Sequence, residues 1–276
     1  MELATVATIA GNELQIQVRS RWVLTFAAVF AALDLAIAYF GMATAGAVGF
    51  QGFTRTSASL LNLVLYLVPI VCLIMGALSF TGERGAAELL FSQPVTRSEI
   101  LVGKLLGLFA AMAAATCLGF GLAGLVIAYH AGPAGAVRYA AFVGLALALA
   151  LVFLALGVLV AVATRNRARA FGLSLFLWFF LVLFYDLLAI GLTFVFPERT
   201  ANLFLFLSLF GNPVDMVRVS GLLTLRGASI FGAAGASLVK FLGGETTANL
   251  AMLAGLAVWV ITPVLAAARI LRRQDI

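Results

Sequence analysis

Apolar residues occur in six long uninterrupted stretches, and the segments between them hold most of the charged side chains. Each stretch has about 20 residues or more, the length that an α-helix needs to cross a hydrocarbon core of about 30 Å. A transmembrane β-barrel would instead show short segments of alternating polarity. The pattern therefore predicts an all-α, polytopic membrane protein with six transmembrane helices. The predicted spans are residues 22–41, 59–80, 105–129, 137–163, 170–196 and 250–270.

Composition supports this class and adds an orientation. Hydrophobic residues make up 64% of the chain and charged residues 10%, whereas about a quarter of the residues in soluble proteins are charged. Eleven of the 17 basic residues lie in the N-terminal segment, alternate loops and the C-terminal segment, while the short loops opposite hold two. Basic residues concentrate on the cytosolic side of membrane proteins. Both termini are therefore expected in the cytosol, and the net charge of +6 does not indicate nucleic-acid binding.

The spans divide the chain into regions. Residues 1–21 carry a helical stripe of apolar positions too short to cross a bilayer, which predicts an amphipathic helix on the cytosolic face, with a loosely ordered leader as the alternative. Residues 22–270 are expected to form the six-helix domain, and residues 271–276 a cytosolic tail. Segment 197–249 is too long for a simple connector, and its apolar runs punctuated by single charges predict interfacial helices that form an external platform. One or two additional spans are the alternative.

The loop 81–104, between the second and third spans, is expected to hold a short, rigid helix. Gly82 can end the second span, and good helix formers then follow until Pro94 stops them. Thr96, followed three residues later by Glu99, is typical of a capping box at the start of the next helix. The short helix would expose leucine and phenylalanine side chains to the cytosol, so we expect it to bind a partner protein.

Motifs for nucleotide binding or side-chain catalysis are absent from the sequence. Gly103-Lys104 lacks the upstream glycine of a phosphate-binding loop. The single histidine, His130, excludes HExxH zinc chemistry, and no G-x-S-x-G elbow occurs. We therefore expect a non-catalytic chain that binds no cofactor or metal itself, so that ATP and magnesium would reside on a partner.

Two acidic residues, Asp34 and Asp186, lie well inside predicted spans. A charged side chain at the bilayer centre costs about 2.5 to 3.5 kcal/mol on insertion scales, so each is expected to face protein or water. Both a polar position on a translocation pathway and a buried hydrogen-bonding role remain open. Four sulfur-containing residues could bind Cu(I) in principle, although helix packing explains them better. They are Cys72, Met75, Met112 and Cys117.

The six spans, the helix-bearing first cytosolic loop and the long segment before the last span resemble the permease subunits of ABC-2 type transporters. The loop resembles the coupling-helix region of that family, which implies docking to an ATPase. The residues that match are Glu83, Arg84, Gly85, Glu88, Leu89, Leu90, Gln93, Pro94, Arg97 and Gly103-Lys104. A second group resembles the external segment of the family, which implies a platform for an external partner. It consists of Asn212, Pro213, Val214, Asp215 and Arg218.

The resemblance implies two copies of the chain in a bacterial inner membrane, with cytosolic ABC ATPase subunits. Within the family, the chain resembles members that support copper-site assembly of nitrous oxide reductase in denitrifying bacteria. That likeness implies a β-helical periplasmic partner, and either a copper-related or sulfur cargo or work on that partner. Alternatives are an ABC-2 permease for another cargo and a structural receptor that anchors a periplasmic protein without transport. A membrane-embedded enzyme is disfavoured, because Asp34 and Asp186 have no evident catalytic partner in the sequence.

Overall fold

The computed structural model describes residues 2–43, 49–81, 95–195, 197–226 and 243–273, and it contains helices and no strands in these ranges. Six helical segments are long and apolar enough to cross a membrane. They span Arg21–Gly41, Thr56–Phe80, Arg97–Leu125, Gly135–Thr164, Arg167–Thr193 and Glu245–Arg272. Each overlaps one predicted span, so the all-α fold with six spans is confirmed.

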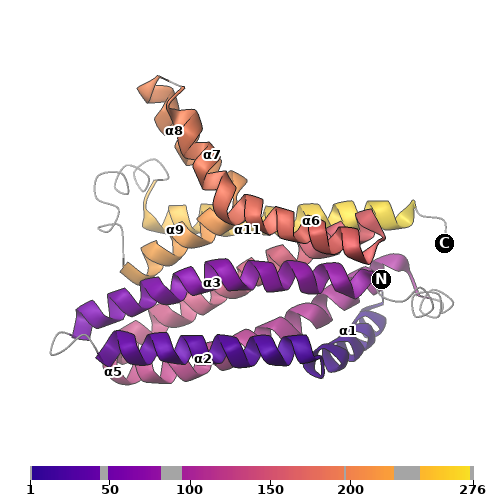
Figure 1. The fold of residues 1–276 in the computed structure, drawn as a ribbon, viewed down its shortest axis with the longest axis horizontal. Coiled ribbons are helices and arrows are strands. Elements are labelled where there is room, and N and C mark those ends of the chain that lie inside the picture. The colour runs from indigo at the N-terminus through magenta and orange to yellow at the C-terminus, as the bar shows by residue number, and fades with distance from the viewer. Residues whose placement is uncertain (1, 44–48, 82–94, 196, 227–242, 274–276) are drawn as a thin grey trace.

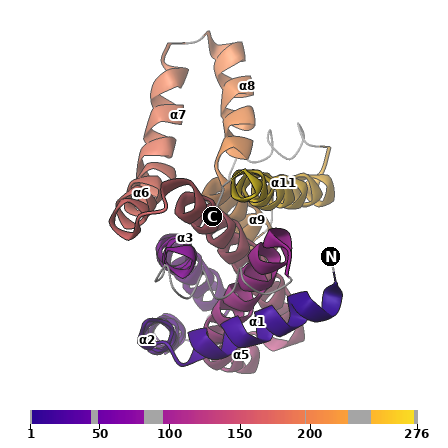
Figure 2. The same ribbon diagram turned by 90° about the vertical axis from the view of Figure 1, so that its right-hand side faces the viewer.

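The first half of the chain forms an end helix and two spans. Helix α1 (Leu3–Val18) buries Val6 and Glu13 and lies across one end of the bundle (Figure 2). Helices α2 (Arg21–Ala43) and α3 (Gly49–Phe80) then run in opposite directions along the bundle (Figure 1). A helix therefore occupies most of the predicted N-terminal segment.

Helix α5 (Arg97–Thr164) contains two spans in one continuous run of helical backbone. The chain nevertheless reverses direction within it. The reversal brings Tyr139 back to Phe120, 19 residues earlier, where the Tyr139 hydroxyl donates to the Phe120 carbonyl oxygen at 2.9 Å. We call residues 97–125 its first limb and residues 135–164 its second limb. The sequence predicted a break between two helices. Helical geometry through the turn instead keeps backbone groups hydrogen-bonded, which an apolar environment favours.

A tight turn joins α5 to the fifth span. Arg165 ends α5 in the left-handed conformation, with a φ of 52°, and the side chain of Asn166 accepts a hydrogen bond from the backbone N–H of Arg169 at the start of the next helix. That span consists of α6 (Arg167–Phe179), the π-helical segment η1 (Phe180–Phe184) and α7 (Tyr185–Thr193). The fifth span is therefore interrupted by a π-helical segment.

Helices α7 and α8 (Glu198–Ser208) form a hairpin that points away from the bundle in both views (Figures 1 and 2). After the 3-10 segment η2 (Leu209–Gly211), helix α9 (Pro213–Arg226) turns back, and the bend between the two apolar halves is 108°. Helix α9 packs against α3, α5 and α11 (Glu245–Arg272). It therefore lies among the bundle helices, whereas the sequence predicted interfacial helices for this segment.

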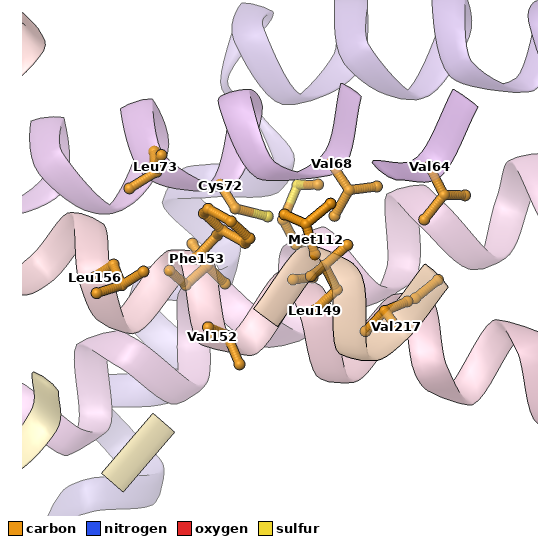
Figure 3. Close-up of a cluster of buried hydrophobic side chains, with 14 of the residues drawn as sticks. Val64, Val68, Cys72, Leu73, Met112, Leu149, Val152, Phe153, Leu156 and Val217 are labelled. Carbon is orange, nitrogen blue, oxygen red and sulfur yellow. The ribbon is translucent and has the colours of Figure 1, made fainter. Parts of the chain in front are cut away.

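The core lies around the second limb of α5, which is the most buried span. Apolar side chains of α3, both limbs of α5 and α9 meet there, and Figure 3 shows Val217 of α9 reaching the cluster. Gly76 of α3 and Gly157 of α5 cross so closely that a Cβ added to Gly157 would lie 2.5 Å from the carbonyl oxygen of Leu73. Small residues therefore set the spacing of the two central helices.

The start of α1 and the end of α11 lie at the same end of the bundle, on the right of Figure 1. We call this the termini end, and the opposite end the far end. The last residues of α3, the first residues of α5 and the turn between α5 and α6 also lie at the termini end. These segments position the candidate site.

Candidate functional site

The first candidate site is the base of the loop that joins α3 to α5, at the termini end. We call Phe80, Thr81 and the segment Thr96–Lys104 the loop base. Eight predicted coupling residues lie outside the described residues, so their interactions stay predictions. They are Glu83, Arg84, Gly85, Glu88, Leu89, Leu90, Gln93 and Pro94. The loop base shows how the two ends of this loop are held.

A capping box starts α5, as the spacing of Thr96 and Glu99 predicts. The Thr96 hydroxyl accepts from the backbone N–H of Glu99 at 3.4 Å, and Oε2 of Glu99 accepts from the backbone N–H of Thr96 at 2.9 Å. Oε1 of Glu99 also accepts from the backbone N–H of Glu2 at 2.7 Å. Glu99 therefore satisfies orphan donors at the starts of two helices, α5 and α1.

Arg97 links the loop base to the last helix. Its Nη1 donates to the carbonyl oxygen of Leu271 at 2.8 Å. Leu271 lies in the final turn of α11, where backbone carbonyls have no partner within the helix. A guanidinium is also well placed there, because the helix dipole leaves partial negative charge at that end. The start of α5 is thereby attached to the end of α11.

Lys104 links α5 to α1 and to the end of α3. Its Nζ lies 3.0 Å from Oε2 of Glu13 in α1, and the two side chains are only 17% and 6% exposed. The same Nζ lies 5.4 Å from the centre of the Phe80 ring, within the range of a cation–π interaction. One ammonium group therefore joins three helices at the loop base.

Two glycines allow α1 to approach α5 closely. A Cβ on Gly103 would lie 2.8 Å from Ile9, and a Cβ on Gly107 would lie 2.6 Å from the carbonyl oxygen of Ala10. The Gly103-x-x-x-Gly107 spacing suits a close helix contact. In this protein, the two glycines contact the N-terminal helix α1. Together with Glu13–Lys104, this contact holds α1 against the first limb of α5.

A second candidate site, which we call the arginine cluster, comprises Asp186, Asn212, Asp215 and Arg218. Nη1 of Arg218 donates to Oδ2 of Asp186 at 2.6 Å and to Oδ1 of Asp215 at 2.8 Å. All three side chains are partly shielded from solvent, with 29%, 33% and 13% exposed for Arg218, Asp186 and Asp215. Two carboxylates share one guanidinium, so the cluster links α7 to α9 and holds one formal negative charge if all three groups are ionised.

Asn212 attaches α9 to the π-helical segment. Its Nδ2 donates to the carbonyl oxygen of Leu181 at 2.8 Å and to Oδ2 of Asp215 at 3.0 Å, while its Oδ1 accepts from the backbone N–H of Val214. A π-helix shifts the regular hydrogen-bond ladder and is frequent at functional sites. Pro213 occupies the first position of α9, where a proline costs no hydrogen bond. The Asn-Pro-Val-Asp motif is thus a helix start docked on the π-helical segment.

The structure brings together residues that were predicted from the sequence to belong to different sites. Asp186, predicted as a pathway residue, binds Arg218, which was predicted to lie on the external platform. Neither this pair nor the Glu13–Lys104 pair was predicted from the sequence. Single charges within apolar runs were the available signal, but spacing along the chain does not tell which of them meet.

Asp34 stands apart from both sites. It lies on α2, is fully buried, and neither carboxylate oxygen has a hydrogen-bond partner among the described residues.

Cys72 and Met112 belong to the apolar core (Figure 3), whereas Cys117 is exposed. Within the described residues, His, Cys, Asp and Glu form no group of three or more that could hold a metal ion.

Comparison with known proteins identifies the class. The family model for ABC-2 family transporter proteins matches residues 7–276, almost the whole chain, so the chain belongs to the ABC-2 transporter family. A probable ABC transporter permease protein NosY from Pseudomonas aeruginosa is 34% identical over 281 residues, covering 99% of this chain and all of the relative. A protein of the same description from Stutzerimonas stutzeri is 38% identical over 125 residues, covering 45% of each chain. The chain is thus a NosY-like ABC-2 permease.

Proposed function

We propose that a separate cytosolic ATPase subunit drives this permease through the loop between α3 and α5. The loop base carries the proposal. Glu99 and Lys104 bind α1, Lys104 also contacts the end of α3, and Arg97 binds the end of α11. A force on the loop would therefore reach four helices at once, because their ends are joined by charged and hydrogen-bonded contacts.

The charge distribution supports a cytosolic termini end. The exposed arginines of the turn between α5 and α6, together with those at the end of α11, lie there. They are Arg165, Arg167, Arg169, Arg269, Arg272 and Arg273. Cytosolic ends of bacterial membrane proteins carry such an excess. This orientation would place the loop base within reach of a cytosolic ATPase, and the chain in the inner membrane.

The family and its relatives support the remaining assignments. We propose that two copies of the chain pair with the ATPase subunits, and that Asn212, Pro213, Asp215 and Arg218 shape the region facing a periplasmic β-helical partner. Similarity to NosY favours a role in copper-site assembly of nitrous oxide reductase. The cargo would be a copper-related or sulfur species, or the energy would be used as mechanical work on the partner.

Copurification from native membranes tests the coupling role. The tagged chain should retain an ABC ATPase that is identified by mass spectrometry and hydrolyses ATP in the eluate. Glu83→Lys combined with Leu90→Asp should abolish ATPase retention while the protein still inserts in the membrane. Glu83→Gln combined with Leu90→Met, which keeps an apolar side chain at position 90 and adds no opposite charge, is the matched control. An undiminished complex with the charge-reversed variant would remove the loop from this role.

A further inference from the structure

A carboxyl group lies inside the bundle without a hydrogen-bond partner among the described residues. Asp34 of α2 is 0% exposed, and both of its oxygens lack a hydrogen-bond partner among the described residues. Gly119 on the first limb of α5 makes room for it, because a Cβ there would lie 2.9 Å from Oδ2 of Asp34. The carboxyl group is therefore enclosed by packing, and no described residue donates a hydrogen bond to it.

The surroundings of Asp34 are aromatic. Phe30, one turn away on α2, stacks with Phe26 at 5.2 Å and meets Phe120 edge-on at 5.2 Å. Phe120 in turn packs edge-on against Phe142 at 5.5 Å. These rings provide no hydrogen-bond donor. Because α2 begins at the termini end, the stacked pair Phe26 and Phe30 separates Asp34 from that end.

Tyr139 is the ionisable neighbour of Asp34 among the described residues, and its hydroxyl donates to the carbonyl oxygen of Phe120. Other described ionisable residues on α2 and on the helices packed against it are exposed, paired at the loop base or buried in the core. They are Arg21 and Tyr39 of α2, Glu2 and Glu13 of α1, Tyr66 and Cys72 of α3, and Arg97, Glu99, Lys104, Cys117 and Arg138 of α5. Arg55, Tyr129 and His130 fall outside the side chains that the structure describes.

An ionised carboxylate is disfavoured in such a place, because it has lost its hydration without gaining donors or a cation from the described residues. A protonated, neutral carboxyl group fits this packing better. A neutral carboxyl group is still an unsatisfied donor and acceptor, so contact with water would stabilise it and allow ionisation. Movement that separates α2 from α5 would accordingly change its protonation.

The two directions along α2 differ. Toward the termini end lie Phe26 and Phe30, whereas toward the far end Ala38 is followed by Gly41, which packs against Thr56 of α3. The Thr56 hydroxyl is also buried without a partner in the described structure. The far-end side of Asp34 therefore offers water a hydroxyl without a partner among the described residues, whereas the termini-end side offers stacked rings. Because Gly41 and Thr56 pack closely, that contact must open before water can enter from the far end.

We propose that Asp34 is a proton-binding site of the permease, neutral when α2 and α5 are packed as here and deprotonated when they separate toward the far end. The proton passes from the carboxyl group to water that enters from that end, and it returns when the helices close. This step rests on the proposed function, because it takes the helix movement from the ATPase cycle. The neutral state of the packed form stands without that cycle.

Infrared spectroscopy of the purified chain tests the neutral state. The wild type at neutral pH should show the carbonyl stretch of an un-ionised carboxylic acid, shifted in D₂O and missing in Asp34→Asn. Asp186→Asn should retain the band, because Asp186 is ion-paired with Arg218. A spectrum in which Asp34→Asn leaves the carboxylic acid region unchanged would overturn the proposal, whether or not the ATPase binds.

The pH dependence of ATP hydrolysis tests proton release in the complex. Asp34→Asn mimics the neutral acid permanently, so its complex should assemble normally but hydrolyse ATP with a flatter pH profile than wild type. An identical pH profile in the two proteins would refute proton release during the cycle. Loss of assembly in the Glu83 and Leu90 double variant addresses the coupling role alone, so failure of that role and failure of the proton site give different results.

Discussion

At the residue scale, the arginine cluster shows why isolated charges can persist in a membrane protein. One guanidinium, that of Arg218, donates to both Asp186 and Asp215, and Asn212 donates to Asp215 and to the π-helical segment. Removing the cation leaves two carboxylates facing each other in a partly dry site. Removing Arg218 should therefore lower the stability of the chain more than removing one partner of a surface ion pair does.

Arg218→Leu should lower the stability of the chain by about 1 to 3 kcal/mol, the range left after discounting a buried pair for its partial exposure. Thermal unfolding in detergent measures the change. Arg138→Leu, which removes an exposed arginine from the second limb of α5, should leave the midpoint nearly unchanged.

Adding Asp186→Asn to Arg218→Leu should recover part of the lost stability, because one unpaired carboxylate is removed with its repulsion on Asp215. A double-mutant cycle measures this coupling between the two sites. Strictly additive effects of the two substitutions would contradict the contact.

The sequence predicted residue roles unevenly. The Thr96 and Glu99 capping box was predictable because its chemistry depends on residues three apart. The Asp186–Arg218 pair joins residues 32 apart across helix α8, the 3-10 segment η2 and a reversal of the chain, and local spacing does not indicate that these residues meet. The sequence shows Asp34 as an isolated acidic residue in a span. Only the packing of α2 on α5 shows that it has no hydrogen-bond partner among the described residues.

At the element scale, the structure makes α1 part of the loop base. Its charged contact is Glu13–Lys104, and its close approach depends on Gly103 and Gly107. The sequence predicted a helix on the membrane face from its apolar stripe, and the helix is present. Its docking on the first limb of α5 was not predicted, because the sequence does not show which helix Glu13 contacts.

Lys104→Met should loosen α1 from α5, because it leaves Glu13 largely buried without its cation. Hydrogen exchange of the α1 amides should become at least several-fold faster, while exchange in the second limb stays unchanged. Exchanging the charges with Glu13→Lys and Lys104→Glu together should restore much of the protection. Equal exchange rates in α1 of wild type and Lys104→Met would contradict the role of the pair.

The crossing of α3 and α5 depends on two glycines. Gly157→Leu should prevent correct packing, at a cost of at least about 2 kcal/mol, because its side chain would meet the α3 backbone and not a flexible side chain. The control is Gly144→Leu. Gly144 lies on the same limb of α5, and no atom lies within 4 Å of a Cβ added there. Size-exclusion profiles in detergent should show aggregation for the first variant and a normal peak for the control.

Spans were the most predictable elements, because their length and apolar composition follow directly from the bilayer. The two exceptions are informative. The two predicted helices at 105–129 and 137–163 share one helical backbone, and segment 197–249 contributes α9 to the bundle interior. Amphipathic runs of similar length can lie on a membrane surface or pack inside a bundle, and tertiary contacts decide between these outcomes.

At the scale of the whole molecule, the termini end gathers the features that would meet an ATPase. The start of α1 and the end of α11 lie there with the loop base and the arginine-rich turn (Figure 1). The far end carries the chain reversal of α5. Asp34 lies between the two ends, behind the stacked rings of Phe26 and Phe30. We therefore assign energy input to the termini end and solvent access to the far end.

Labelling of single cysteines in living cells tests this assignment most directly. In a background with Cys72→Ser and Cys117→Ser, cysteine is placed at Arg84, at Arg167 in the turn between α5 and α6, or at Arg138 near the chain reversal of α5. The account predicts that a membrane-impermeant maleimide labels the Arg138 position in intact cells, and labels the other two only after the membrane is opened. Labelling of Arg84→Cys and Arg167→Cys in intact cells, with Arg138→Cys protected, would place the loop base outside the cytosol and contradict the account.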